Sequence, residues 1–146
     1  LNLIKENYRK APYFDEIYPF IQELYSLECE KMIDFNMASI RMLMSLFYIE
    51  DTEIIYASEL QAEGKSNELV VNLVKAAGCS RYLSGTGARN YFIPEVYERA
   101  GVEVIWQKFE HPVYPQQFGE FIPYLSSIDL LLNCGRERSS EIIRNC

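Results

Sequence analysis

The chain has 146 residues, of which 49% are hydrophobic, so it can bury a core and is near the usual length of one domain. Its 21 acidic and 14 basic residues give a net charge of −7, which argues against nucleic acid or an anionic membrane as a partner. The four cysteines are far apart and form no CxxC pair, which excludes a dense disulfide framework and favours free thiols in a reducing cytoplasm.

The longest apolar run late in the chain, Leu130 to Leu132, is far too short to span a bilayer, so we expect no membrane insertion. The single histidine, His111, lies far in sequence from any cysteine pair, so we expect no metal site and no other cofactor. The sequence begins at Leu1 with a helical pattern already under way. We therefore expect residues 1–146 to form a single domain that is the C-terminal, larger part of a longer chain.

The N-terminal part of the chain has helical spacing. Apolar residues recur at intervals of three and four between residues 13 and 27, and Pro19 interrupts this stripe. We expect a short turn there, followed by a helix that starts near Pro19. From about residue 30 to 48, apolar residues lie on most sides, which predicts a helix that is covered on more than one face.

Short apolar runs and helical patterns alternate in the middle of the chain. Gly78 and Gly101 follow the two helical patterns as natural helix stops. Strands that alternate with helices indicate a parallel sheet with right-handed crossovers. We predict an α/β fold, a parallel sheet of at least three strands flanked by helices, like half of a Rossmann fold, with the loops after the strands meeting at one edge. The expected strands are Ile54–Ala57, Tyr82–Leu83 and Val102–Phe109, and the expected helices are Ser66–Ala77 and Ile93–Ala100.

The last third of the chain is irregular until about Gly119 and then predicts short helices over residues 121–133 and 137–145. Asp129 is embedded among apolar residues there, and such a carboxylate needs a partner or has a perturbed pKa. A serine N-cap at Ser126 or Ser127, with Asp129 in the first turn, explains most of this pattern structurally. We interpret Cys134 as a buried thiol rather than a nucleophile.

Lys65 and Ser66 form the first pair of candidate binding residues. With Gly64 they follow an expected strand and open a helix, as does the end of a phosphate-binding P-loop. The glycine that this motif needs five residues earlier is Glu59, so we reject a P-loop. Ser66 as a plain helix N-cap is the better interpretation, although Lys65 and Ser66 lie at the predicted sheet edge, where a ligand would touch them.

A loop with two glycines follows the expected strand at residues 82–83. It can direct backbone N–H groups toward an anion, and Arg89 adds a charged planar fork. The third glycine of a dinucleotide fingerprint is Tyr91 here, so we reject that reading. The alternative is a tight turn that needs positive φ at its glycines and nothing more. The candidate anion-binding residues are Ser84, Gly85, Thr86, Gly87, Arg89 and Asn90.

His111 and Glu110 are the candidate catalytic residues. Histidine is the side chain whose proton equilibrium lies nearest neutral pH. Glu110 is adjacent, but neighbouring side chains in an extended segment point to opposite faces, so a Glu-His pair does not follow. Pro112 and Pro115 fix the backbone around His111 and Tyr114, which either preorganises a site or closes a loop. The alternative to catalysis is a structural histidine.

Five blocks of this sequence resemble the WbqC-like protein family, a bacterial family whose genes commonly lie among those for O-antigen and other surface polysaccharides. The resemblance runs from about residue 1 to 135, and its last two blocks are long and specific. It implies a transferase in sugar modification, sometimes suggested to be a glycine transferase, without established catalytic residues. Family members carry a further N-terminal segment, with a strand and a Gln-Pro loop, that is missing here. The blocks are Asn7–Phe14, Glu63–Ser66, Tyr82–Gly85, Glu110–Gln116 and Phe121–Gly135.

Together, the residues and the resemblance predict a cytoplasmic transferase that moves a small group and binds a nucleotide-linked sugar or another activated anionic donor. Arg89 and the amides of Gly85 to Gly87 would hold the anion, and His111 would remove a proton from the acceptor. Tyr114 and Gln116 would orient the sugar. The alternative is a non-catalytic module that recognises a sugar nucleotide or a partner enzyme. The missing N-terminal segment or a second copy of the chain is the expected macromolecular partner.

Overall fold

The computed structural model describes residues 1–146 and divides them into two compact units. The first unit comprises residues 1–52 and 110–146, and the second comprises residues 53–109. Each unit has its own cluster of buried hydrophobic side chains. The expectation of a single domain over residues 1–146 stays a prediction.

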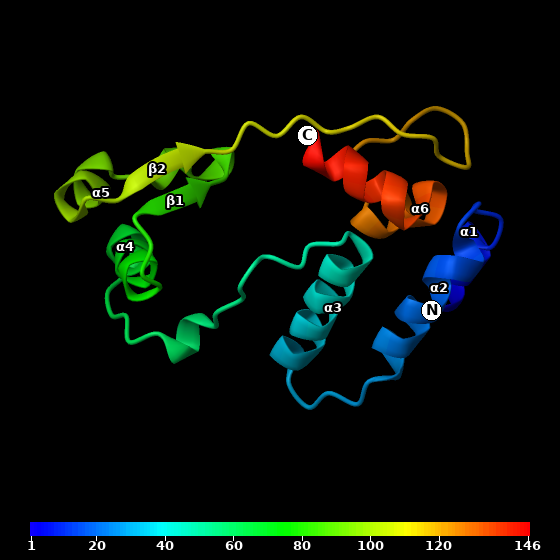
Figure 1. Cartoon of the computed structure of the whole chain (residues 1–146), viewed down its shortest axis with the longest axis horizontal. Coiled ribbons are helices and arrows are strands. Elements are labelled where there is room, and N and C mark those ends of the chain that lie inside the picture. The colour runs from blue at the N-terminus through cyan, green and yellow to red at the C-terminus, as the bar shows by residue number, and fades with distance from the viewer. The chain divides into compact units, whose positions relative to one another are not determined.

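The first unit is built from helices. Helix α2 packs against both α3 and α6, so three helices surround one core (Figure 1). The segment of residues 110–126, which precedes α6, forms no regular element and is called the 110–126 segment below. The helices are α1 (Asn2–Tyr8), α2 (Phe14–Ser26), α3 (Met32–Leu46) and α6 (Ser127–Arg144).

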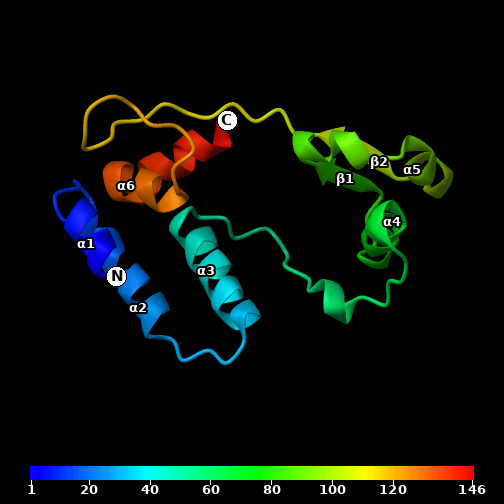
Figure 2. The ribbon, with the colours of Figure 1, turned by 180° about the vertical axis from the view of Figure 1, so that it is seen from behind.

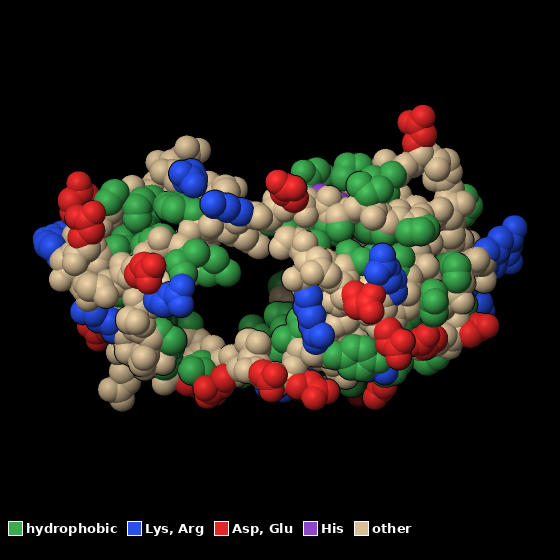
Figure 3. Space-filling model, turned by 45° about the horizontal axis from the view of Figure 1, so that its top comes forward, with side chains coloured by type: hydrophobic (Ala, Val, Ile, Leu, Met, Phe, Trp, Pro, Cys, Tyr) green, Lys and Arg blue, Asp and Glu red, His purple; other side chains and the backbone are tan.

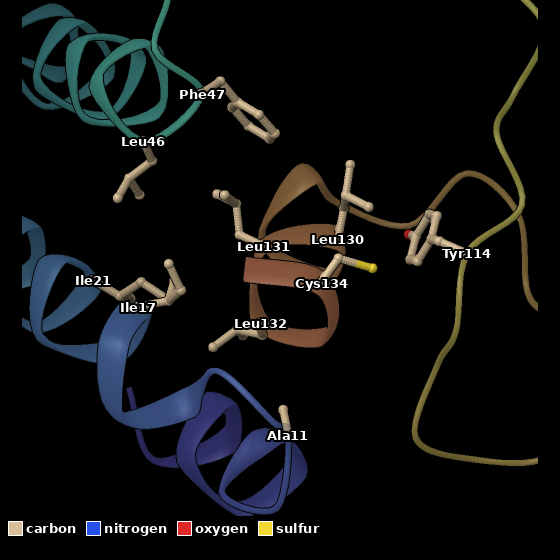
Figure 4. Close-up of a cluster of buried hydrophobic side chains, with 10 residues drawn as sticks. All are labelled: Ala11, Ile17, Ile21, Leu46, Phe47, Tyr114, Leu130, Leu131, Leu132 and Cys134. Atoms are coloured by element: carbon tan, nitrogen blue, oxygen red, sulfur yellow. The ribbon is translucent and has the colours of Figure 1, made fainter. Parts of the chain in front are cut away.

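The core of the first unit lies where α2, α3 and α6 meet. Ile17 and Ile21 are one helical turn apart on α2 and face Leu131 and Leu132 of α6, while Leu46 enters from the end of α3 (Figure 4). All five side chains are fully buried. Burial of each such side chain stabilises the fold by roughly 1.5–3 kcal/mol. The spacing of four in α2 is therefore the sequence feature that fixes this helix against α6.

Two expectations for these helices differ from the structure. Helix α2 begins at Phe14 and continues through Pro19, because the proline removes one N–H donor without preventing burial of the apolar stripe. Helix α3 is not covered on more than one face, since only Met37 and Leu46 are buried along it. Met32, at its start, is 80% exposed.

Helix α6 consists of two helical pieces that meet at Gly135. This glycine has φ 72° and ψ 174°, a backbone region that is essentially restricted to glycine. A Cβ atom at this position would lie 2.5 Å from the ring of Tyr13. The backbone N–H of Tyr13 donates to the carbonyl of Leu132 at 3.1 Å. Two helical pieces are therefore present as expected, but the first begins at Ser127 and not at residue 121, and the break lets Tyr13 approach the α6 backbone.

The second unit contains a small parallel sheet. Strands β1 and β2 pair in parallel, with Ser84 opposite Trp106, and α5 lies in the crossover between them (Figure 2). Val71, Tyr97 and Val102 form its buried core. The elements are η1 (Ala57–Glu59), α4 (Ser66–Ala76), β1 (Arg81–Ser84), η2 (Thr86–Tyr91), α5 (Pro94–Ala100) and β2 (Glu103–Trp106).

The predicted α/β fold, with a sheet of at least three strands, is wrong, and so is the Rossmann-like half. The chain is mostly helical, and its sheet has two strands. Residues 54–57 form no strand: the N–H of Glu59 donates to the carbonyl of Tyr56 at 2.9 Å, and the N–H of Tyr56 donates to the Glu59 carboxylate at 3.4 Å. These local bonds satisfy backbone groups that a strand would pair with a neighbour.

On the face shown in Figure 3, acidic, basic and hydrophobic side chains are all exposed. Tyr124 is one of the exposed hydrophobic residues, at 80%. None of the helices combines the length and the hydropathy that a membrane crossing requires.

Candidate functional site

His111 lies in the 110–126 segment, and both of its ring nitrogens take part in hydrogen bonds. The backbone N–H of Tyr124 donates to Nε2 at 3.0 Å, and Nδ1 lies 2.9 Å from the carbonyl oxygen of Pro112. Because Nε2 accepts, Nδ1 carries the proton and donates to Pro112. The ring also packs edge-on against Tyr124, with the ring centres 4.9 Å apart. His111 therefore links Pro112 and Tyr124 within the 110–126 segment. To act as a base, its Nε2 would first have to release the N–H of Tyr124.

A buried carboxylate organises the same unit. Asp129, in the first turn of α6, is 4% exposed. Its Oδ1 accepts from the hydroxyl of Tyr8 at 2.8 Å and from Nδ2 of Asn133 at 3.2 Å. Its Oδ2 accepts from the hydroxyl of Tyr114 at 2.9 Å and from Nε2 of Gln116 at 3.0 Å. These four donors match the lone-pair positions of an ionised carboxylate.

The positions of these donors are themselves fixed. The Gln116 amide donates to the carbonyl of Ile122 at 3.0 Å and accepts its N–H at 2.9 Å, which sets the orientation of the amide. The hydroxyl of Ser126 accepts from the N–H of Ile128 at the start of α6, so the predicted serine N-cap is confirmed. Asp129 therefore receives its donors from a preorganised frame.

Burial keeps the hydroxyl groups of this cluster protonated. Burial, followed by the hydrogen bond to Asp129, raises the pKa of Tyr114 from 10.0 to about 12. The same two causes raise the pKa of Tyr8. Burial also raises the pKa of the Cys134 thiol, which favours the unreactive thiol over the thiolate. The predicted interpretation of Cys134 as a buried thiol agrees with this environment.

A cleft of about 240 Å³ opens beside the Asp129 cluster, within the first unit. The side-chain nitrogen and oxygen of Gln117 are both buried and form no hydrogen bond with any group of the chain. No lysine, arginine or histidine lines the cleft. The lining residues are Asn7, Tyr8, Gln116, Gln117, Phe118, Ile122, Leu125 and Asp129.

A second cavity, of about 180 Å³, lies at the carboxyl end of β1 in the second unit. Ser66, the first residue of α4, and Ser84, the last residue of β1, both line it. Asn67 is buried and holds the loop beside the cavity, because its amide donates to the carbonyl of Tyr91 at 3.0 Å and accepts the N–H of Ile93 at 3.2 Å. Four aromatic side chains complete much of the wall: Tyr82, Tyr91, Phe92 and Tyr97.

The two glycines of the loop after β1 do not serve a left-handed turn. Gly85 has φ −70°, and Gly87 is not among the residues with positive φ. A Cβ atom at either position would meet no atom within 4 Å. The alternative interpretation, a tight turn that needs positive φ, is therefore wrong, and nothing within the chain requires glycine at these two positions.

Ser66 is not the N-cap that the sequence suggested. Helix α4 begins at Ser66, and Lys65 occupies the cap position without a side-chain cap bond. Ser66 itself has φ 53°, a conformation that is uncommon for residues other than glycine. Such residues cluster at binding sites, where the surrounding structure holds the strain.

Arg89 lies at the same end of the sheet as Ser84. Its guanidinium carbon is 4.6 Å from the ring centre of Trp106, and Trp106 is the partner of Ser84 in the strand register. A cation held over an aromatic ring keeps a defined position. Thr86 and Asn90 are exposed residues of η2.

The residues predicted for the site belong to different units. Lys65, Ser66 and residues 84–90 lie in the second unit, where Ser66 and Ser84 share a cavity. Residues 110–116 lie in the first unit, with Glu110 exposed there. That Arg89 and His111 lie near one another stays a prediction.

Sequence reasoning noted Asp129 but missed two of its donors and the buried amide of Gln117. Asn133 follows Asp129 by four residues on one helix face, so the spacing of the pair was a readable signal. Tyr8 is 121 residues away from Asp129, and no local pattern connects them. Nothing in the sequence distinguishes the buried amide of Gln117 from that of an exposed glutamine.

Comparison with known proteins places this chain among related sequences. A protein of Mycobacterium tuberculosis, "Uncharacterized protein Rv1507c", is 28% identical over 143 residues, which are 96% of this chain and 61% of the relative. The chain thus spans less than two thirds of that relative's length. No solved structure matches the chain. The model of the WbqC-like protein family matches residues 1–141, so the chain belongs to the WbqC-like protein family.

Proposed function

We propose that the protein is a group transferase of sugar modification, which binds a nucleotide-linked sugar or a similar anionic donor in its second unit. The observation that carries the proposal is the cavity of about 180 Å³ where Ser66 and Ser84 meet. In parallel βα units, ligands bind beyond the carboxyl ends of the strands. The aromatic wall offers ring faces against which a base or a sugar of the donor can stack.

Charge at this end of the unit favours an anion. Lys65 directly precedes Ser66, and Arg89 is positioned on the ring of Trp106. An Arg guanidinium binds phosphate through two parallel hydrogen bonds. Gly85 and Gly87 leave open space over the loop, which lets the backbone approach a ligand closely. Close approach of a ligand would thus explain why glycine occupies positions 85 and 87, where the backbone conformation does not require it.

We assign binding of the acceptor to the cleft of the first unit. Gln116 lines its cleft and is held in one orientation, as a residue that orients a sugar must be. Tyr114 is 6% exposed and donates to Asp129, so its role is to support that cleft from behind. The association of the family's genes with O-antigen and other surface polysaccharides supports polysaccharide biosynthesis as the setting of the reaction.

A second candidate function is a binding module without chemistry. The hydrogen bonds at both ring nitrogens of His111 favour it, because a general base needs a free nitrogen at the acceptor. In this case the protein holds the sugar nucleotide or delivers it to a partner enzyme, and His111 is a structural ring.

Calorimetry with UDP-glucose and GDP-mannose, with mass spectrometry of the products, tests the proposal. Removal of the guanidinium in Arg89→Ala should weaken sugar-nucleotide binding by roughly tenfold or more, because a hydrogen bond to a charged group contributes about 1.5–3 kcal/mol. Arg99→Ala is the matched control, since Arg99 is an exposed arginine of the same unit on α5. Its affinity should equal that of the wild type.

The outcomes separate the candidates. If neither sugar nucleotide binds, or if Arg89→Ala binds as tightly as the wild type, the donor site is refuted. If His111→Ala lowers turnover by roughly a hundredfold, His111 is the base. Binding without any transfer product, unchanged in His111→Ala, establishes the module instead.

A further inference from the structure

We infer that the cavity of the second unit receives the base of the donor, a uracil or thymine ring, and that the Tyr97 hydroxyl recognises the edge of that base. The inference rests on the proposed function, because it names the part of the sugar nucleotide that enters the cavity. Lys65 and Arg89 each adjoin a residue of the cavity wall, so the phosphates and the sugar lie outside, beside these two cations. Of the two sugar nucleotides named above, UDP-glucose is therefore the one that fits.

The Tyr97 hydroxyl is a polar group of the cavity without a partner. Tyr97, on α5, is 4% exposed and lines the cavity, so its remaining accessible surface faces the cavity. Its hydroxyl forms no hydrogen bond with the chain, and its oxygen is not among the partnerless side-chain atoms that are sealed from solvent. A ligand in the cavity can therefore reach this oxygen and supply the hydrogen bond that folding leaves unmade.

Aromatic rings hold Tyr97 in place and leave one ring available to a ligand. The rings of Tyr82 and Tyr97 are nearly parallel, with their centres 6.0 Å apart, and the ring centre of Phe92 lies 4.8 Å from that of Tyr97. Tyr91 also lines the cavity, but it is 67% exposed and packs against none of these rings. Its ring can therefore stack on the face of a base that enters the cavity.

The size of the cavity favours a single ring. Its volume of about 180 Å³ is a little more than the roughly 150 Å³ of a protein cavity that accommodates benzene, so one six-membered ring fits inside. A purine would bring a second fused ring, and the rest of a nucleotide has to stay outside. Ser66 and Tyr91 are exposed residues of the wall, so the cavity is open to solvent on their side.

The free hydroxyl groups of the wall favour a base with carbonyl oxygens. Ser66 Oγ accepts from Nδ2 of Asn67 at 3.2 Å, which leaves its own proton to donate to a ligand. Burial raises the pKa of Tyr97, so this hydroxyl also keeps its proton and can donate. Uracil and thymine present two carbonyl oxygens as acceptors, whereas cytosine presents an amino group in place of one of them.

Calorimetry with UMP, GMP and ribose 5-phosphate tests the inference. Ribose 5-phosphate has the sugar and the phosphate of UMP without the base, so UMP should bind at least about tenfold more tightly. GMP, with its larger base, should also bind roughly tenfold more weakly than UMP. Arg89→Ala should weaken the binding of all three ligands by a similar factor, because each of them carries a phosphate.

Tyr97→Phe separates recognition from folding. It removes a hydroxyl without a partner and keeps the ring, so the variant should melt no lower than the wild type. Its affinity for UMP should fall roughly fivefold or more, and its affinity for ribose 5-phosphate should not change. The control Tyr25→Phe, at an exposed position on α2, should bind UMP as the wild type does.

Three results would overturn the inference. These are equal affinity for UMP and ribose 5-phosphate, equal affinity for UMP and GMP, and unchanged binding of UMP by Tyr97→Phe. If Arg89→Ala still weakens binding in these cases, or if GDP-mannose binds and UDP-glucose does not, the anionic donor site stands and only the base cavity is refuted. If none of the nucleotides or sugar phosphates binds, both the inference and the proposed donor site are refuted.

Discussion

Asp129 connects three separate stretches of the first unit. Its four donors come from the end of α1 (Tyr8), from the 110–126 segment (Tyr114 and Gln116) and from its own helix (Asn133). A buried charge costs several kcal/mol unless donors surround it, so the carboxylate is stable only while all four stay in place. Two of these donors, Tyr8 and Gln116, also line the cleft. The carboxylate therefore holds the cleft wall in one conformation.

The Tyr114 hydroxyl should make the stability of the protein sensitive to alkaline pH. Its pKa is raised from 10.0 to about 12 in the folded state, so its contribution is complete below pH 10 and is lost as the pH rises toward 12. The free energy of unfolding should therefore fall across this range, and less steeply in Tyr114→Phe. Urea unfolding at several pH values measures this slope. The exposed control Tyr25→Phe should keep the wild-type slope, and equal slopes in wild type and Tyr114→Phe would contradict the assignment.

At the scale of elements, the second piece of α6 forms hydrogen bonds at the C-terminal end of α3. The last carbonyl groups of a helix have no partner within it, and cations there also meet the negative end of the helix dipole. Side chains of α6 donate to the carbonyl of Ser45 in the last turn of α3 and to the carbonyls of the two residues that follow α3, and so fix the two helices against each other. The pairs are Arg136 with Ser45, Ser140 with Phe47 and Arg144 with Tyr48, at 3.0, 2.7 and 3.1 Å between donor and acceptor.

Gly135→Ala should disrupt this arrangement. The alanine would have to keep a backbone conformation restricted to glycine, and its Cβ would overlap the Tyr13 ring, so we expect a loss of roughly 2–4 kcal/mol in unfolding free energy. Gly85→Ala is the matched control, because its φ of −70° and its open surroundings accept a Cβ. Chemical denaturation followed by circular dichroism measures both.

A double variant separates the two causes at Gly135. On a Tyr13→Ala background the overlap with the ring is absent, so Gly135→Ala should cost less there than in the wild type. Equal costs on both backgrounds would show that the backbone conformation alone requires glycine.

At the scale of the whole molecule, the chain has two hydrophobic clusters that share no residue. One joins α2, α3 and α6, and the other joins α4 and α5 with the strands. Regions with separate cores open with separate free energies, which hydrogen exchange detects.

Core truncations should therefore act mainly on their own unit. Leu131→Ala removes a fully buried side chain and should lower unfolding stability by about 2–5 kcal/mol, with loss of amide protection in α2, α3 and α6. Val71→Ala, at a position 4% exposed, should lower protection in α4, α5 and the strands. Hydrogen exchange with mass spectrometry reads both patterns. Identical patterns in the two variants would instead show that the whole chain opens as one unit.

Local sequence patterns predicted much of the second unit. Helical spacing and the following glycines located α4 and α5, and Gly101 ends α5 in the left-handed conformation expected of a helix stop. The strands predicted at residues 82–83 and 102–109 correspond to β1 and β2 of the structure. Strand β2 is shorter than predicted. These features depend on residues close together in the chain, so a single sequence carries the information.

The sequence by itself determined the local features: the helices with clear periodicity, the two strands, the serine cap at Ser126 and the blocks that resemble the family. Only the tertiary structure decided the number of strands, the donors of Asp129 and the bonds of the His111 ring. A strand exists only where another strand pairs with it, and a buried carboxylate is stable only where donors from distant segments meet it. Contacts of this kind join residues far apart in the chain, and no local pattern records them.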